Sequence, residues 1–257
     1  MNPGYNPQNQ GYGSNANPGS SPGSSPGSKP YGAGALNSVA NASPEVRANF
    51  IRSTYLLFVS GILCSLLVGA LTLSSYAITM AALSAISSPL LAILLIVGGS
   101  MAAQAIARTP GLNLVGLYGF TGLIGFLFAP VLRIYEMQQP GIVGQAAFLS
   151  VLVFGSLSAY ALVSKTNFSF LGGMIFVGMI AIIGAGIANL LIFHSAGIGY
   201  WLAWATLFMS SGFVLWRTSR MVHEYAPNEN VAAALGLFIS FFNIFLSILR
   251  ILGGNRR

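Results

Sequence analysis

A line of small and polar residues runs through the last apolar stretch of the chain. Its members are spaced four, three, four and three residues apart: Gly236, Ser240, Asn243, Ser247 and Arg250. That spacing places them on one face of an α-helix. Such a face could line a solvated ion pathway, or it could allow close helix packing and interhelical hydrogen bonds. Packing is the more common use of these residue types, and both interpretations remain open.

A second polar face lies in the preceding apolar stretch, where Thr206, Ser210 and Arg217 are four and seven residues apart. A cation at this depth is costly, so Arg217 should pair, contact water, or extend its side chain to the membrane surface. Extension to the inner surface is the simplest account. For Glu136, three residues after Arg133, we expect a local helical ion pair rather than an ion-binding role.

The chain offers few groups for catalysis or for metal binding. It has no Asp, one Cys, two His and only four acidic residues, which are Glu45, Glu136, Glu224 and Glu229. Paired-carboxylate mechanisms, zinc hydrolase sites, disulfide frameworks and carboxylate cages for Ca²⁺ or Mg²⁺ all need more ligands than these. A phosphate-binding loop of the Walker type is also absent from the sequence. We therefore expect neither an enzyme nor a bound cofactor or metal.

Long apolar stretches must position these residues. Of the 257 residues 54% are hydrophobic and 6% are charged, whereas soluble domains carry roughly 25% charged residues. A membrane-spanning helix needs ~20 apolar residues, and seven stretches meet or approach this length: Thr54–Leu73, Leu90–Ala107, Leu112–Leu132, Ile142–Ser164, Phe170–Phe193, Tyr200–Trp216 and Val231–Leu252. Because period-two alternation is absent, the prediction is an all-α polytopic membrane protein.

The first 46 residues differ from the rest of the chain. Pro18, Pro22, Pro26 and Pro30 recur every four residues among Ser, Gly, Asn and Gln. Such a segment buries too little apolar area to offset the entropy of ordering it. Residues 1–46 are therefore predicted to be a disordered tail, with a Tyr/Pro interaction segment as the alternative, and residues 47–257 to be the membrane domain. The tail lacks the features of a cleaved secretory signal.

Basic residues indicate the orientation in the membrane. With the N-terminus inside, the inner segments hold seven Lys or Arg residues and the outer loops hold only Arg133. This asymmetry predicts a cytoplasmic N-terminus. If the last stretch spans fully, Arg250, Arg256 and Arg257 lie outside. The charge count slightly favours a re-entrant last stretch, and a full seventh span remains open.

Several motifs in order resemble the Bax inhibitor-1 (transmembrane Bax inhibitor motif) family. They lie between about Arg52 and Gly253 and are Arg52-Ser53-Thr54-Tyr55-Leu56-Leu57, Gly119-Phe120-Thr121-Gly122-Leu123, Pro130, Ser158-Ala159-Tyr160-Ala161-Leu162, Lys165-Thr166-Asn167-Phe168-Ser169-Phe170-Leu171-Gly172-Gly173, Thr218-Ser219-Arg220 and Asn243-Ile244-Phe245-Leu246-Ser247-Ile248-Leu249-Arg250-Ile251-Leu252-Gly253. The resemblance implies six helices around a central seventh. It also implies either a pH-sensitive Ca²⁺ leak or a modulator of stress and cell-death responses.

This chain departs from the family at the positions that matter for the leak. The resemblance implies two aspartates, on helices six and seven, that share protons and gate the path, and a latching Arg on helix two. Here the aspartate positions are Arg217 and Ser240, and Arg217 would repel Arg108 on the second stretch. A guanidinium does not titrate near neutral pH and disfavours divalent cations. The carboxylate-based Ca²⁺ gate therefore does not transfer to this chain.

Two functions follow as hypotheses. The first is a pathway for the leak of ions such as Ca²⁺, with pH gating that is altered or lost. Its candidate pathway and gate residues are Arg108, Arg217, Ser240, Asn243, Ser247 and Arg250. The second is a non-conducting scaffold that regulates other membrane proteins in a stress response. Beyond the lipid bilayer, the expected partners are ions or membrane proteins, and no nucleic acid. The expected location is a bacterial cytoplasmic membrane.

Overall fold

The computed structural model describes residues 38–164, 166 and 168–254. Most of the predicted tail, residues 1–37, lies outside this part of the chain. The described elements are all helical: η1 (Val39–Asn41), α2 (Pro44–Ser74), α3 (Tyr76–Ser87), α4 (Pro89–Ile93), η2 (Leu94–Gly98), α5 (Gly99–Ile106), α6 (Asn113–Gln138), α7 (Ile142–Val163), η3 (Phe168–Phe170), α8 (Leu171–Ala188), η4 (Asn189–Phe193), α9 (Ala196–His223) and α10 (Asn230–Gly254).

The seven predicted spans are confirmed. Seven helices are long and apolar enough to cross a membrane: Pro44–Ser74, Pro89–Ile106, Asn113–Gln138, Ile142–Val163, Leu171–Phe193, Ala196–His223 and Asn230–Gly254. Several extend beyond the predicted apolar stretches because polar residues continue the helix into the interface. The second and fifth spans each contain a π-helical turn, η2 and η4 respectively.

The boundary of the predicted tail needs a correction. Helix η1 and the start of α2 lie within residues 38–46, which we assigned to the tail. Val39 is fully buried, and its N–H donates a hydrogen bond of 2.9 Å to the carbonyl of Tyr225. Ser43 accepts from the N–H of Val46 at 3.4 Å and so caps α2, followed by Pro44 at the first helical position. These residues therefore belong to the membrane domain.

Helix α3 is an element that we did not predict. It occupies residues 76–87, between the first two spans, and packs against α6. At 12 residues it is too short to cross the hydrocarbon core, and most of its residues are exposed or half-buried. A stretch this short gave no spanning signal in the sequence, although its composition is apolar.

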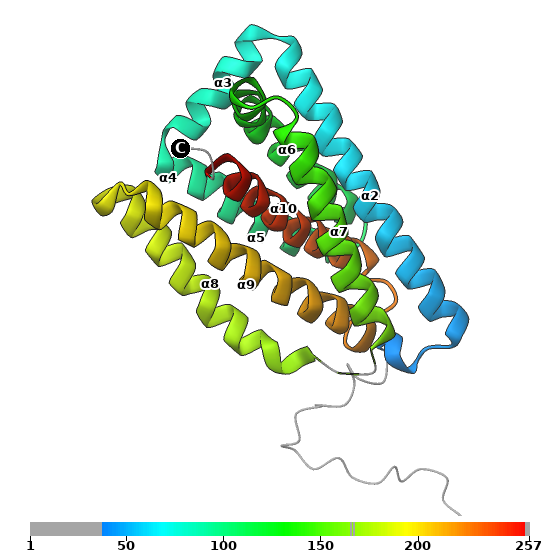
Figure 1. Ribbon diagram of the computed structural model, residues 1–257. Helices are drawn as coiled ribbons and strands as arrows, with labels where there is room; N and C mark the ends of the chain where they lie inside the picture. The colour runs from blue at the N-terminus through cyan, green and yellow to red at the C-terminus, as the bar shows by residue number, and fades with distance from the viewer. Residues whose placement is uncertain (1–37, 165, 167, 255–257) are drawn as a thin grey trace, which may run out of the picture.

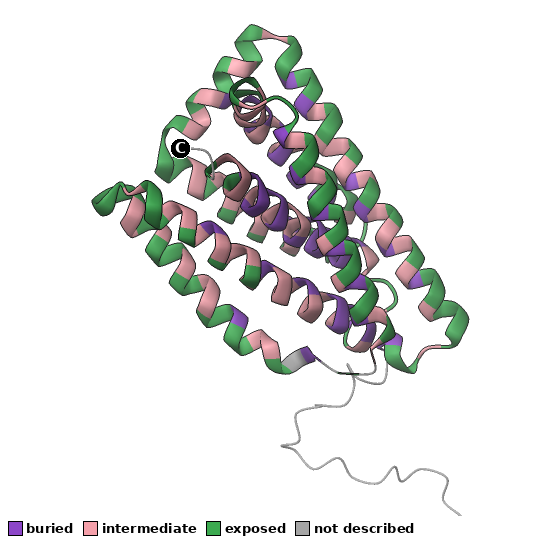
Figure 2. Cartoon of the chain, viewed as in Figure 1, coloured by how far each residue is buried: buried purple, intermediate pink, exposed green. Residues whose placement is uncertain are grey.

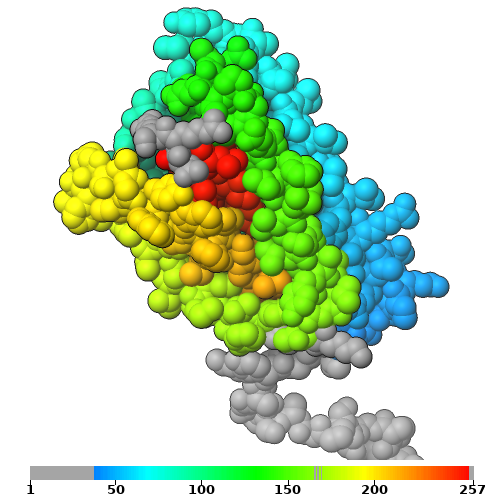
Figure 3. All heavy atoms as spheres, in the orientation of Figure 1, coloured from blue at the N-terminus to red at the C-terminus, as the bar shows by residue number. Residues whose placement is uncertain are grey.

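Helix α10 forms the centre of the bundle, as Figures 1 and 2 show. It packs against α2, α5, α6, α7 and α9, and 14 of its 25 residues are buried. In Figure 3 only a narrow red part of it is visible between α7 and α9. Helix α8 is peripheral, with Ile175 as its single buried residue, and it joins the outer layer by packing on α9. The predicted all-α fold with six helices around a central seventh is confirmed, with α8 contacting the bundle through α9.

The re-entrant alternative for the last stretch is wrong. Helix α10 runs without a break over 25 residues, a length of about 37 Å at 1.5 Å per residue. It begins beside the α9–α10 loop that contacts η1, and it ends beside Gln138 and Ala196 at the opposite face. We call the face that holds η1 the N-terminal side. Continuous helical hydrogen bonding through the core is more favourable than a break among lipid tails.

Aromatic side chains of α10 pack against aromatic side chains of its neighbours. Phe238 meets Phe120 of α6 edge-on, with ring centroids 6.4 Å apart, and Phe242 meets Phe128 at 4.8 Å. On another side, Phe241 lies 5.5 Å from Phe154 of α7. Each such pair adds about 0.5–1.5 kcal/mol to the packing. These contacts fix the rotation of α10 and therefore the direction in which its polar face points.

Candidate functional site

Arg217 lies between helices near the N-terminal side of the bundle. Its Nη2 donates a hydrogen bond of 3.3 Å to Oε1 of Gln104 on α5, and its Cζ lies 4.5 Å from the ring centroid of Phe213. Gly236 of α10 is directly opposite. A β-carbon at Gly236 would lie 3.1 Å from Cζ of Arg217 and closer still to its Nη1. The absence of a side chain at Gly236 therefore makes room for the guanidinium.

Three arginines converge on one cavity of about 460 Å³ beside Arg217. We call it the arginine pocket. Its residues come from α5 and the turn that follows it, from α8 and α9, and from the start of the α9–α10 loop: Met101, Gln104, Arg108, Gly172, Ile175, Phe176, Met179, Phe213, Trp216, Arg217, Arg220 and Tyr225. None of these lining residues is acidic, so the pocket attracts anions and repels cations.

Within the pocket, Arg220 is the arginine with an ionic partner. Its Nε lies 2.5 Å from Oε2 of Glu224, one turn later in the chain, and its Cζ lies 4.7 Å from the ring centroid of Trp216. Trp216 in turn packs against Gly172 of α8, where a β-carbon would lie 2.7 Å from the indole Nε1. The small residue at the start of α8 thus lets Trp216 close one side of the pocket.

The structure brings only part of the predicted site together. Arg108 and Arg217 both line the arginine pocket, so two positive charges lie near each other there. Ser240 is fully buried, and its hydroxyl donates to the carbonyl of Gly236 at 3.0 Å. Ser247 donates in the same way to the carbonyl of Asn243 at 2.7 Å. Both hydroxyls are therefore bound within α10 itself.

Arg250 lies near the opposite end of α10, away from Arg108 and Arg217. It is exposed and lines a separate cavity of about 680 Å³ with Tyr135, Gln138 and Tyr200. Ser240, Asn243 and Ser247 line neither this cavity nor the arginine pocket. The polar face of α10 thus has a cation-lined cavity at each end and buried, internally bonded hydroxyls in between.

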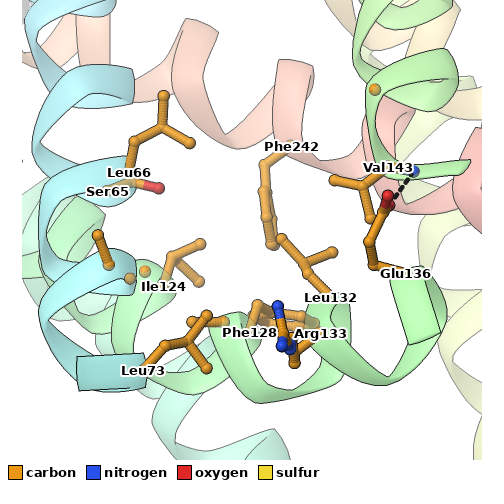
Figure 4. Close-up of a pocket in the computed structure, with 15 residues that line it drawn as sticks. Ser65, Leu66, Leu73, Ile124, Phe128, Leu132, Arg133, Glu136, Val143 and Phe242 are labelled. Carbon is orange, nitrogen blue, oxygen red and sulfur yellow. Dashed lines mark hydrogen bonds between the residues drawn. The ribbon is translucent and has the colours of Figure 1, made fainter. Parts of the chain in front are cut away.

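A third cavity, of about 500 Å³, is mostly apolar (Figure 4). It lies between α2, α6, α7 and α10 on the side opposite to the N-terminal side, and Arg133 and Glu136 are its charged residues. Figure 4 shows Glu136 turned toward Val143. The carboxylate accepts hydrogen bonds from the N–H groups of Gly141 at 2.6 Å and Val143 at 3.2 Å. Glu136 thus caps α7. The described residues show no ion pair between Glu136 and Arg133, so the expectation of one is wrong.

Two residues of the arginine pocket were missed by sequence reasoning. Gln104 is a polar residue inside an apolar stretch, and it lies four residues before Arg108, on the same helical face. That spacing was a usable signal. Arg220 was noted only as part of a family motif, and its position in the pocket depends on how α9 packs against α8. Among the residues that the structure describes, no three His, Cys, Asp or Glu gather into a metal-binding group.

Comparison with known proteins places this architecture in a family. The sequence matches the family described as inhibitor of apoptosis-promoting Bax1 over residues 47–257. The mouse protein lifeguard 4 is 31% identical over 217 residues, which are 83% of this chain and 88% of that protein. Among bacterial relatives is the Escherichia coli K12 modulator of FtsH protease YccA, 31% identical over 142 residues. Its counterpart in Escherichia coli O6:H1 is named inner membrane protein YccA and matches equally well.

The two YccA matches are partial. They cover 55% of this chain and 64% of each relative, so the chain spans less than two thirds of the length of these proteins. Neither the family description nor these three names is that of an enzyme. The family match, by contrast, extends over the whole membrane domain and agrees with the seven helices and the central α10. The protein is thus an integral membrane protein that belongs to the Bax inhibitor-1 family.

Proposed function

We propose that this protein is a membrane regulator of other membrane proteins and does not conduct Ca²⁺. The observation that carries the proposal is the position of Arg217, held between Gln104 and Gly236 where the family resemblance implies a gating carboxylate. A permanent cation there raises the energy of a divalent cation at that end of the bundle. The hydroxyls of Ser240 and Ser247 are bound to carbonyls of α10 and offer little coordination to a passing ion.

The proposed partner is another integral membrane protein, and a membrane-bound protease of the FtsH kind is our specific candidate. The name of the related YccA protein, a modulator of FtsH protease, supports this choice. The name of its counterpart supports location in a bacterial inner membrane. The distribution of Lys and Arg supports a cytoplasmic N-terminus. On this orientation the arginine pocket faces the cytoplasmic leaflet.

Liposome flux tests the absence of Ca²⁺ conduction. We expect the reconstituted wild-type protein to release no more Ca²⁺ than empty liposomes at any pH near neutrality. The Arg217→Asp, Ser240→Asp double variant restores the carboxylate pair, and we expect it to show pH-dependent flux if the rest of the path is intact. An Arg217→Asn, Ser240→Asn variant is the matched control without charge. A steep pH-dependent Ca²⁺ flux through the wild-type protein would refute the proposal.

A second experiment tests regulation directly. An FtsH-type protease is reconstituted with a membrane substrate, with and without this protein, and the rate of substrate degradation is measured. We expect the rate to change and the two proteins to crosslink in the bilayer. A variant lacking residues 1–37 tests whether the tail makes the contact; this deletion keeps Val39, which is buried against the fold. An unchanged rate together with no crosslinking would reject the protease as partner.

An ion leak is the second candidate. The cavities at the two ends of α10, one with Arg217 and one with Arg250, favour it, because they leave only the middle of the helix to be crossed. A path between two cationic ends would show weak selectivity for Ca²⁺ and no gating by a carboxylate pair. Anion flux measured in the same liposomes separates this candidate from a protein that conducts nothing.

A further inference from the structure

The arginine pocket has a charge imbalance that the described residues do not correct. Arg108, Arg217 and Arg220 contribute three positive charges, and Glu224, paired with Arg220, contributes one negative charge. The remaining excess is +2. Glu229, the next acidic residue, binds the backbone N–H of Ala226 at 3.0 Å. Like charges gathered near a membrane are unfavourable unless an anion lies among them.

Arg217 also has unused hydrogen-bond donors. A guanidinium carries five N–H donors, yet within the described residues the Arg217 side chain makes one hydrogen bond, to Gln104. Its Nε is buried and has no partner among those residues. The side chain of Arg108 is exposed and likewise has no hydrogen bond or ion pair in the described part of the chain. The pocket therefore offers donors to an acceptor that comes from outside the chain.

The rest of the pocket is apolar and opens sideways. Met101 of α5 and Phe176 of α8 line it, and each is 67% exposed. Both belong to helices that span the membrane, one turn or more from the helix ends. Their exposed surfaces therefore face lipid tails, while Arg108 and Arg220 lie near the ends of their spans, at headgroup level. The pocket is thus cationic toward the headgroups and apolar toward the hydrocarbon.

We propose that the arginine pocket binds an anionic phospholipid of the leaflet on the N-terminal side. Its phosphate would lie among the three guanidinium groups, and one acyl chain would lie along Met101, Phe176 and Met179. Guanidinium groups bind phosphate oxygens in bidentate fashion, and basic pockets between membrane helices are suited to anionic headgroups. A soluble anion would use the arginines but not the apolar half. This binding site goes beyond the proposed regulatory function and does not depend on it.

Lipid binding to the full-length protein tests this inference. The protein is purified in a neutral detergent, and dioleoyl phosphatidylglycerol or dioleoyl phosphatidylcholine is added while bound lipid is counted by native mass spectrometry and thermal stability is followed. We expect retained phosphatidylglycerol and a rise in the melting temperature, with little effect of phosphatidylcholine. Arg108→Gln and Arg220→Gln should each weaken the binding of phosphatidylglycerol by about tenfold or more, since each removes a charge-assisted hydrogen bond.

Arg52→Gln is the matched control, because Arg52 is an exposed cation at the same side of the bundle but outside the pocket. We expect it to bind phosphatidylglycerol like the wild type. Equal weakening in Arg52→Gln and Arg108→Gln would overturn the site, because it would show only general attraction to anionic lipid. Equal retention of both lipids by the wild type would also overturn it.

Two further arms identify the ligand. Inorganic phosphate and glycerol phosphate carry the headgroup chemistry without acyl chains, and full stabilisation by either would overturn the assignment to a lipid. An acidic peptide that displaces phosphatidylglycerol from the wild type but not from Arg108→Gln would assign the pocket to a protein segment instead. A phosphatidylglycerol with a photoreactive acyl chain should label α5 and α8. Labelling elsewhere would contradict the proposed position of the chain.

Discussion

Gly236 of α10 provides the space in which the guanidinium of Arg217 from α9 lies. A β-carbon at residue 236 would approach Cζ of Arg217 to 3.1 Å and Cδ to 3.3 Å. This pair joins the central helix to the outer layer at the level of the arginine pocket. The sequence alone does not reveal this pairing. A glycine in a membrane helix is usually a packing residue, and an arginine near a helix end usually extends to the membrane surface.

Gly236→Ala should therefore displace Arg217 and weaken its hydrogen bond to Gln104. We expect a loss of about 1–3 kcal/mol in unfolding free energy, as is typical of overpacking, seen as a lower melting temperature in detergent. In an Arg217→Met background the same Gly236→Ala change should be close to neutral. An equal loss in both backgrounds would show that Gly236 and Arg217 are not coupled.

The close approach of α2 and α6 at Gly125 gives a second prediction. A β-carbon at Gly125 would lie 2.9 Å from the carbonyl carbon of Ser65 and 3.0 Å from its Cα, so Gly125→Ala pushes two backbones apart. We expect it to cost about 1–3 kcal/mol of stability. Gly69→Ala is the matched control, since its β-carbon would lie at an ordinary 3.4 Å from that of Ala129. Thermal unfolding of both variants decides the matter, and a loss in Gly69→Ala as large as that in Gly125→Ala would contradict the packing.

The cap at the start of α7 separates Glu136 from Arg133. Glu136→Ala removes the carboxylate that binds the N–H groups of Gly141 and Val143. We expect a loss of about 0.5–2 kcal/mol, in the range of helix caps. Arg133→Gln should leave stability nearly unchanged because Glu136 binds α7 instead. If chemical denaturation shows similar losses for both variants, the two side chains form the ion pair after all.

The buried hydroxyl groups differ in what they hold together. The Oγ of Ser219 accepts a hydrogen bond of 3.1 Å from the buried N–H of Phe168 and so links α9 to η3. Ser219→Ala leaves this donor unpaired, which should cost about 1–3 kcal/mol. Ser240→Ala removes only a bond within α10 and should cost less than half as much. Melting temperatures in the reverse order would mean that Ser240 has a partner beyond α10.

Much of the fold was predictable from the sequence. Membrane spans can be recognised in the sequence because a helix needs a minimum apolar length to cross the bilayer. That requirement does not depend on which helices the span contacts. Helix α3 escaped this criterion because it is short. The full span of α10 was not predicted either. The count of Lys and Arg residues includes three arginines near the C-terminus, but it takes no account of the energetic cost of breaking a helix in lipid.

The sequence by itself determined the membrane class, the seven spans, the polar face from Gly236 to Arg250 and the absence of Asp. Only the tertiary structure decided which of these polar groups meet. In the tertiary structure Arg108, Arg217 and Arg220 line one pocket, and Glu136 binds the start of α7. The physical reason is that spacing along a helix sets the face on which a side chain lies, whereas packing between helices sets the neighbour which that face meets.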